Sequence, residues 1–99
     1  MPVHNADIAT IFNEIAELLE IQGANPFRIR AYRNAALTIG EFGRELAAMI
    51  RNGEALPKIP GVGDDLSRKI HEIASTGHCS LLDRLHKELP VTLLSLIHI

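Results

Sequence analysis

The stretch IPGVGDDLSRKI, residues 59–70, decides how this chain folds, because it joins a glycine turn to a helical pattern. Gly61 and Gly63 lie one residue apart and permit backbone conformations that other residues avoid. Leu66 and Ile70 then share one helical face, which Ile73 and Ala74 continue. The stretch therefore predicts a tight loop that leads directly into an amphipathic helix.

Helical spacing of apolar residues recurs on both sides of this loop, and no segment alternates as a strand does. Asn5 or Asp7 is expected to cap the first helix, Asn25 before Pro26 the second, and Asp64 the helix after the glycines. The predicted helices cover residues 7–21, 25–40, about 41 or 44 to 52, 64 to Gly77, and 80–88. We expect an all-α fold, a small helical bundle with a helix-hairpin-helix motif at about residues 44–76.

Aliphatic side chains must form most of the core, because only 4% of the residues are aromatic and none is tryptophan. The residues expected in this core are Phe12, Ile15, Leu19, Ile29, Tyr32, Ile39, Leu46, Ile50, Leu66, Ile70 and Ile73.

The chain has 99 residues, which predicts one helical domain over residues 1–90 and an apolar tail over residues 91–99. A single cysteine, Cys79, allows no intramolecular disulfide. Neither a secretory signal nor an apolar run of about 18 residues is present, so we expect a cytoplasmic protein without membrane contact. We also expect a monomer.

The glycine loop has the composition of a phosphate-binding hairpin. The backbone N–H groups of Gly61, Val62 and Gly63, together with the start of the next helix, can converge on one anion, and the helix dipole favours that anion. Lys58 before the loop and Arg68 after it add positive charge. Such a hairpin binds the nucleic-acid backbone and does not read base sequence. The alternative is an interhelical turn that needs glycine for its shape alone.

Two segments together, NPFRIRAYRNAA (residues 25–36) and LPKIPGVGDDLSRKIHEIASTG (residues 56–77), resemble the N-terminal helical domain of family X DNA polymerases of the bacterial type. The resemblance covers about residues 7–90. It implies that the hairpin binds the 5′-phosphate side of gapped or nicked DNA. In some members the domain also removes a 5′-deoxyribose phosphate through a Schiff base on a lysine.

Three family positions fall on Lys69 (the Schiff-base lysine), Tyr32 (its aromatic neighbour) and Arg28 (a phosphate contact). A second phosphate-binding lysine of vertebrate members falls on Asp65, an acid. The run LPVTLLSLIHI at the end resembles the approach to the family's second hairpin, which implies that the chain is part of, or descends from, a longer polymerase-like protein.

The charges around these positions also have an ordinary explanation. Asp65, Lys69 and Glu72 lie on one side of their helix, where an acid four residues before a lysine forms a surface ion pair. Both carboxylates favour the protonated lysine, which opposes Schiff-base chemistry. Arg30 and Arg33 are further candidate DNA contacts, but arginine stems often lie along an apolar flank.

Three functions from different classes therefore remain: a DNA-binding module for gapped or 5′-phosphorylated ends, the same module as a deoxyribose-phosphate lyase, and a protein-interaction domain with a structural hairpin. Polymerase activity is excluded in this chain, since the resemblance assigns it to a separate palm domain for which there is no room. No cofactor and no zinc site are expected, since Cys79 has no second cysteine or paired ligand spacing. A monovalent cation at the hairpin loop remains compatible with the sequence.

Overall fold

The computed structural model describes residues 3–88, which form five helices and no strand. They are α1 (Asn5–Ile21), α2 (Pro26–Glu41), α3 (Leu46–Arg51), α4 (Asp64–Thr76) and α5 (Ser80–Glu88). This confirms the predicted all-α class. The apolar tail predicted for residues 91–99 and the boundary at residue 90 lie outside the described residues.

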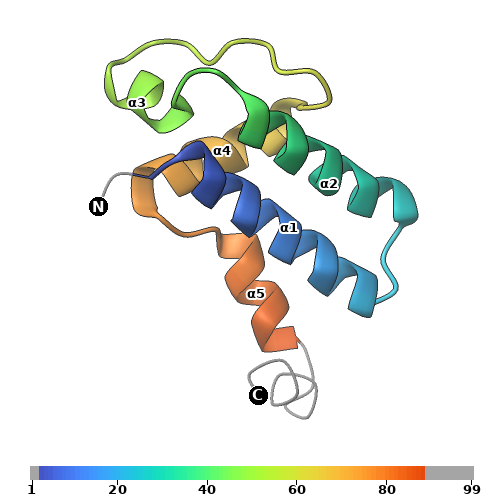
Figure 1. Cartoon of the computed structure of the whole chain (residues 1–99). Coiled ribbons are helices and arrows are strands. Elements are labelled where there is room, and N and C mark those ends of the chain that lie inside the picture. The colour runs from blue at the N-terminus through green and yellow to red at the C-terminus, as the bar shows by residue number, and fades with distance from the viewer. Residues whose placement is uncertain (1–2, 89–99) are drawn as a thin grey trace.

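Helices α1 and α2 run antiparallel along most of their length and form the centre of the bundle (Figure 1). Their apolar faces meet at Phe12 and Tyr32, whose rings pack edge to face with centroids 5.5 Å apart. Such a pair adds about 0.5–1.5 kcal/mol beyond the area it buries. Helices α4 and α5 cover the other side of α1 and complete the core with Ile70, Ile73 and Leu85.

Two residues predicted in the core, Ile29 and Ile50, are only partly buried at its edge. Ile29 lies in the first turn of α2, whereas the contact with α1 falls one turn later, on Tyr32, Ala35 and Ala36. The buried residues of α3 are Leu46, Ala47 and Met49, so Ala47 is in the core where Ile50 was expected. The other nine predicted core residues are buried as expected.

The helix starts differ from the prediction in three places. The first helix begins at Asn5 with His4 as its N-cap, and the carboxylate of Asp7 accepts the His4 backbone N–H at 2.9 Å. The third helix begins only at Leu46, because the Leu46 N–H donates to the Asn5 side chain at 2.9 Å. The N-cap of α4 is Gly63, which makes Asp64 its first residue.

The remaining predicted ends are confirmed. Asn25 caps α2 by accepting the Phe27 N–H at 2.8 Å, with Pro26 at the first position. Gly77 ends α4 in the left-handed region at φ 77°, which a side chain would disfavour. Among the helices of residues 3–88, none combines the length and hydropathy that a membrane crossing requires.

Candidate nucleic-acid interface

The hairpin between α3 and α4 closes with a tight turn that requires one of its glycines. The Val62 N–H donates to the carbonyl of Ile59 at 3.0 Å, which places Pro60 and Gly61 at the centre of a four-residue turn. Gly61 has φ of 80°, as the third residue of a type II turn must. Ile59 is buried in the core and anchors the turn, while Lys58, Pro60 and Gly61 face solvent.

Gly63 has a different reason to be glycine. Its φ of −88° is open to any residue, and a Cβ added there would meet no atom within 4 Å. The absent side chain instead leaves the first turn of α4 uncovered, and no side chain caps it. Among residues 3–88, no acceptor bonds the N–H groups of Gly61, Gly63, Asp64, Asp65 or Leu66. The prediction that the Val62 N–H joins them is wrong, because the turn already uses this donor.

These unbonded donors meet an anion's requirements, since helix N-termini present N–H groups and a positive dipole end. Two of these donors, on Gly61 and Gly63, belong to residues that line a shallow pocket, together with Lys58, Ile59, Pro60 and Val62. Asp64 and Asp65 lie in the same first turn and oppose an incoming phosphate by their charge.

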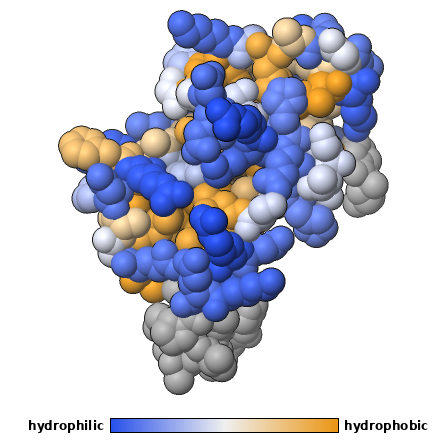
Figure 2. Space-filling model, turned by 180° about the vertical axis from the view of Figure 1, so that it is seen from behind, coloured by the Kyte–Doolittle hydropathy of each residue, from blue (hydrophilic) through white to orange (hydrophobic). Residues whose placement is uncertain are grey.

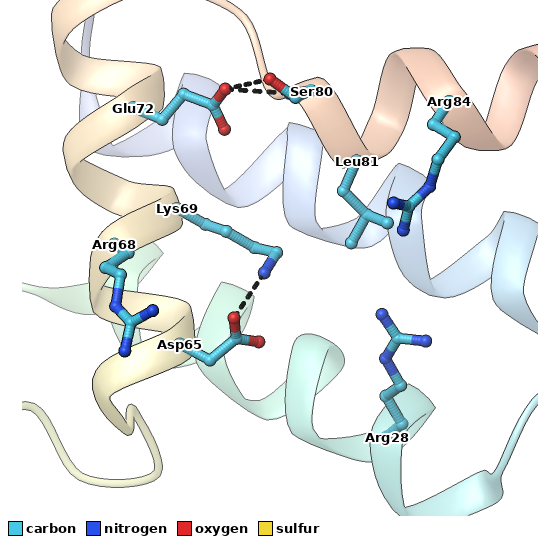
Figure 3. Close-up of a pocket in the computed structure, with 8 residues that line it drawn as sticks. All are labelled: Arg28, Asp65, Arg68, Lys69, Glu72, Ser80, Leu81 and Arg84. Atoms are coloured by element: carbon cyan, nitrogen blue, oxygen red, sulfur yellow. Dashed lines mark hydrogen bonds and ion pairs between the residues drawn. The ribbon is translucent and has the colours of Figure 1, made fainter.

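A second pocket, of about 740 Å³, lies beside α4 and is called here the arginine groove (Figure 3). Three helices supply its lining, which is Arg28 from α2, Asp65, Arg68, Lys69 and Glu72 from α4, and Ser80, Leu81 and Arg84 from α5. It therefore contains four cationic side chains and two carboxylates, although the whole chain has a net charge of −2. On the face opposite that of Figure 1, strongly hydrophilic residues lie on both sides of exposed apolar atoms (Figure 2).

Lys69 reaches the groove with its ammonium on the Asp65 carboxylate, 2.8 Å away (Figure 3). Partial burial lowers the pKa of Lys69, but the hydrogen bond that Lys69 donates to Asp65 and the charges of Tyr32 and Asp65 outweigh it and leave that pKa raised. The hydrogen bond from Lys69 in turn lowers the pKa of Asp65. Lys69 is therefore held as an ammonium in the free protein.

Glu72, which the sequence grouped with Lys69, is engaged elsewhere. Its carboxylate accepts the Ser80 N–H at 3.2 Å and also the Ser80 hydroxyl, so it caps the start of α5. The hydroxyl of Ser80 is the main cause of the lowered pKa of Glu72. The prediction that Glu72 acts on Lys69 is therefore replaced by a structural role that fixes α5 against α4.

Tyr32 is buried in the core and does not line the groove. The whole residue is 1% exposed, its ring packs on Phe12, and its buried hydroxyl has no hydrogen-bond partner among the described residues. Burial raises the pKa of this phenol, against the opposing charges of Lys69 and Arg28. Its predicted contact with DNA stays a prediction.

The predicted cationic residues do not all come together. Arg28, Arg68 and Lys69 line the arginine groove, and Lys58 lies at the hairpin. Arg30 instead lies over the Phe27 ring, 5.6 Å from its centroid, and Arg33 pairs with Glu20 at 2.8 Å. Neither lines the groove, so their predicted role in binding DNA is not supported by their position.

Arg84 is the groove residue that sequence reasoning missed. It lies three residues after Leu81, which also lines the groove, and one helical turn along α5. Residues three apart on a helix are neighbours, so the sequence could have placed Leu81 and Arg84 on the same face of α5. Only the tertiary structure could show that this face of α5 lines one groove with residues of α2 and α4.

Metal ligands do not gather anywhere in the described part of the chain. Across residues 3–88 no three His, Cys, Asp or Glu side chains lie together as a metal site requires. A monovalent cation at the hairpin loop stays a prediction.

Comparison with known proteins agrees with this geometry. Residues 3–79 match the family described as helix-hairpin-helix domain. The chain is also 32% identical over 95 residues to the Bacillus subtilis (strain 168) protein named DNA polymerase/3′-5′ exonuclease PolX, and the match covers 96% of this chain. It spans only 16% of that relative's length. Matched over most of its length, this chain belongs to the family of helix-hairpin-helix domains.

Proposed function

We propose that this chain is a DNA-binding module that recognises gapped or nicked DNA through a 5′-phosphate, within a family X polymerase or a protein derived from one. The observation that carries the proposal is the uncapped N-terminus of α4, whose unbonded N–H groups lie between Lys58 and the arginine groove. The similarity to a protein named as a DNA polymerase supports DNA as the ligand.

The two pockets suit different parts of a DNA strand. The hairpin amides suit a phosphate of the continuous backbone, because backbone N–H groups position a strand without reading its bases. The arginine groove suits the end of the strand, where charge is concentrated. Local positive charge can bind DNA in spite of the net charge of −2, because only one face makes the contact.

Fluorescence anisotropy with a labelled gapped duplex tests the proposal. We expect tighter binding when the downstream strand carries a 5′-phosphate than when it ends in a hydroxyl, and a steep loss of affinity with salt for both. Equal binding of the two duplexes would contradict end recognition. Absence of binding to either at low salt would contradict DNA binding and favour the protein-interaction alternative.

A second function, cleavage of a 5′-deoxyribose phosphate, is favoured by one observation: the Lys69 side chain is only 17% exposed and its ammonium opens onto the groove. After losing its proton, the amine would add to the sugar aldehyde and release water to give an imine. Loss of a proton from the carbon next to the imine would then break the C–O bond to the 3′-phosphate, which leaves with the DNA strand. Hydrolysis of the imine by water would release the unsaturated sugar phosphate and restore the Lys69 amine. The raised pKa of Lys69 opposes the first step, so this function ranks second.

Borohydride trapping on incised abasic DNA separates the two functions. A covalent adduct that disappears in Lys69→Ala would establish the lyase. An adduct undiminished by Lys69→Ala would exclude Lys69 as the nucleophile. Binding without any adduct would leave a phosphate-binding module without this chemistry.

A further inference from the structure

Arg84 of α5 faces Arg28 of α2 across the arginine groove, with their guanidinium groups pointing toward one another (Figure 3). Like charges that face each other across a groove repel, and an anion between them removes that repulsion. The two residues lie on different helices, 56 positions apart in the sequence. The packing of α5 therefore creates an opposed pair of arginines that neither segment contains by itself.

The carboxylates of the groove offset this pair only in part. Asp65 pairs directly with Lys69 and feels the charge of Arg28 only as a weaker influence on its pKa, and Glu72 accepts hydrogen bonds from Ser80. Four cationic side chains against two carboxylates leave the groove positive. Arg28 forms no ion pair with any residue of the described chain within 4 Å. Within residues 3–88, the one ion-pair partner of Arg84 is Glu88 of its own helix, at 3.7 Å on an exposed surface, where such pairs contribute little.

We propose that Arg84 is a specificity-determining residue of the groove, which with Arg28 holds a terminal phosphomonoester from opposite walls. Guanidinium groups suit this ligand because each can donate two parallel hydrogen bonds to phosphate oxygens. A terminal phosphate carries about −1.5 to −2 charges near neutral pH, whereas a diester within the strand carries one. Two opposed arginines therefore favour the strand end over the continuous backbone.

Leu81 gives the groove a second feature that fits a strand end. It lines the same α5 wall one turn before Arg84, and it is largely buried. An apolar surface beside the phosphate site can contact the deoxyribose that bears the phosphate. The ligand class is thus a 5′-phosphorylated nucleotide end, and this inference rests on the proposed DNA-binding function.

The test measures affinity for the 5′-phosphorylated and the 5′-hydroxyl gapped duplex with the wild-type chain, Arg84→Gln and Lys87→Gln. Lys87 lies on the same helix outside the groove lining, so its variant matches the change in charge. We expect Arg84→Gln to weaken binding of the phosphorylated duplex about tenfold, as loss of a charge-assisted hydrogen bond implies. Binding of the hydroxyl duplex should change less than twofold, and Lys87→Gln should change neither by more than that.

Three results would overturn the inference. Unchanged preference for the phosphate in Arg84→Gln, with wild-type binding intact, would exclude Arg84 while leaving the proposed function standing. Equal weakening of both duplexes would make Arg84 a general backbone contact. Failure of the wild-type chain to bind either duplex would refute the proposed function and this inference together. Circular dichroism of each variant keeps loss of folding separate from loss of contact.

Discussion

At the scale of single residues, Lys69 reaches the groove with its charge already matched by Asp65. The Asp65 side chain is 73% exposed, so water screens the pair. Pairs of this kind, four residues apart on a helix, contribute about 0.3–0.5 kcal/mol. A phosphate oxygen can therefore replace Asp65 as the partner of Lys69 at small cost.

Asp65→Asn should lower the free energy of unfolding by about 0.5 kcal/mol at neutral pH, and by less in acid. Because the hydrogen bond from Lys69 lowers the pKa of Asp65, this contribution is present above the carboxyl's unfolded-state value and is lost as pH falls through the folded-state value. At high pH the range in which the pair stabilises the fold is limited by Lys69, whose pKa is raised in the folded protein. The contribution of Lys69 is present below its unfolded-state pKa and is lost as pH rises through its folded-state pKa. Urea unfolding over a series of pH values measures the difference.

Asp64→Asn is the matched control, because it removes a carboxylate from the same helical turn but no ion pair. If the free energies of unfolding of the wild type and Asp65→Asn differed by the same amount at neutral and acid pH, the Asp65–Lys69 ion pair would not be the cause of the difference. Asp65→Asn should also tighten binding of phosphorylated DNA several-fold, since it removes a repulsive charge and frees Lys69, and Asp65→Lys should tighten it further.

At the scale of secondary-structure elements, α4 is built to leave its N-terminus open. A serine, threonine, aspartate or asparagine is the usual N-cap, and the structure has Gly63 there with no side-chain substitute. The other end of the same helix has an ordinary glycine stop at Gly77. The donors left at the start of α4 are therefore available to a ligand.

Gly63→Ser should change stability and DNA binding in opposite directions. The serine oxygen would accept an N–H of the first turn and stabilise α4 by a few tenths of a kcal/mol relative to glycine. The same oxygen would occupy a donor that a phosphate needs, so affinity for DNA should fall several-fold. Urea unfolding and fluorescence anisotropy measure the two effects.

Gly61→Ala serves as the contrasting variant, because φ of 80° makes a side chain there costly by about 1–2 kcal/mol. It should lower stability, whereas Gly63→Ser should not. If Gly63→Ser bound DNA as tightly as the wild type, the amides of α4 would not be the phosphate contact.

At the scale of the whole molecule, Asn5 joins the beginning of the chain to the hairpin. Its side chain is buried, donates to the Arg44 carbonyl at 2.7 Å and accepts the Leu46 N–H at 2.9 Å. Its own backbone N–H donates to the Glu45 carboxylate at 3.0 Å. These bonds link residues about 40 positions apart and fix where α3 starts, so the hairpin depends on the N-terminal helix for its placement.

Asn5→Ala should lower the free energy of unfolding by about 2 kcal/mol, because it leaves the buried N–H of Leu46 and the partly buried carbonyl of Arg44 without their partner. Asn13→Ala is the control, since Asn13 is exposed on the same helix. Chemical denaturation followed by circular dichroism compares them. Equal effects from the two substitutions would show that the Asn5 contacts add nothing beyond helix propensity.

The sequence by itself determined the helical class, the C-terminal ends of all five helices to within one residue, and the glycine hairpin. These features are local: 3.6-residue periodicity, Asn25 before Pro26, and Gly77 in the left-handed conformation depend on neighbours in the chain. The pairing of Asp65 with Lys69 was predictable for the same reason, since four residues separate them on one helix.

Only the tertiary structure decided which distant residues share a surface. The Leu46 N–H donates to the side-chain oxygen of Asn5, so the start of α3 could not follow from its own sequence. Glu72 accepts a hydrogen bond from Ser80 and does not pair with Lys69. The packing of α5 places Arg84 opposite Arg28 across the groove. Periodicity assigns a residue to a face of its own helix, but the composition of a groove between three helices depends on the angles at which they pack.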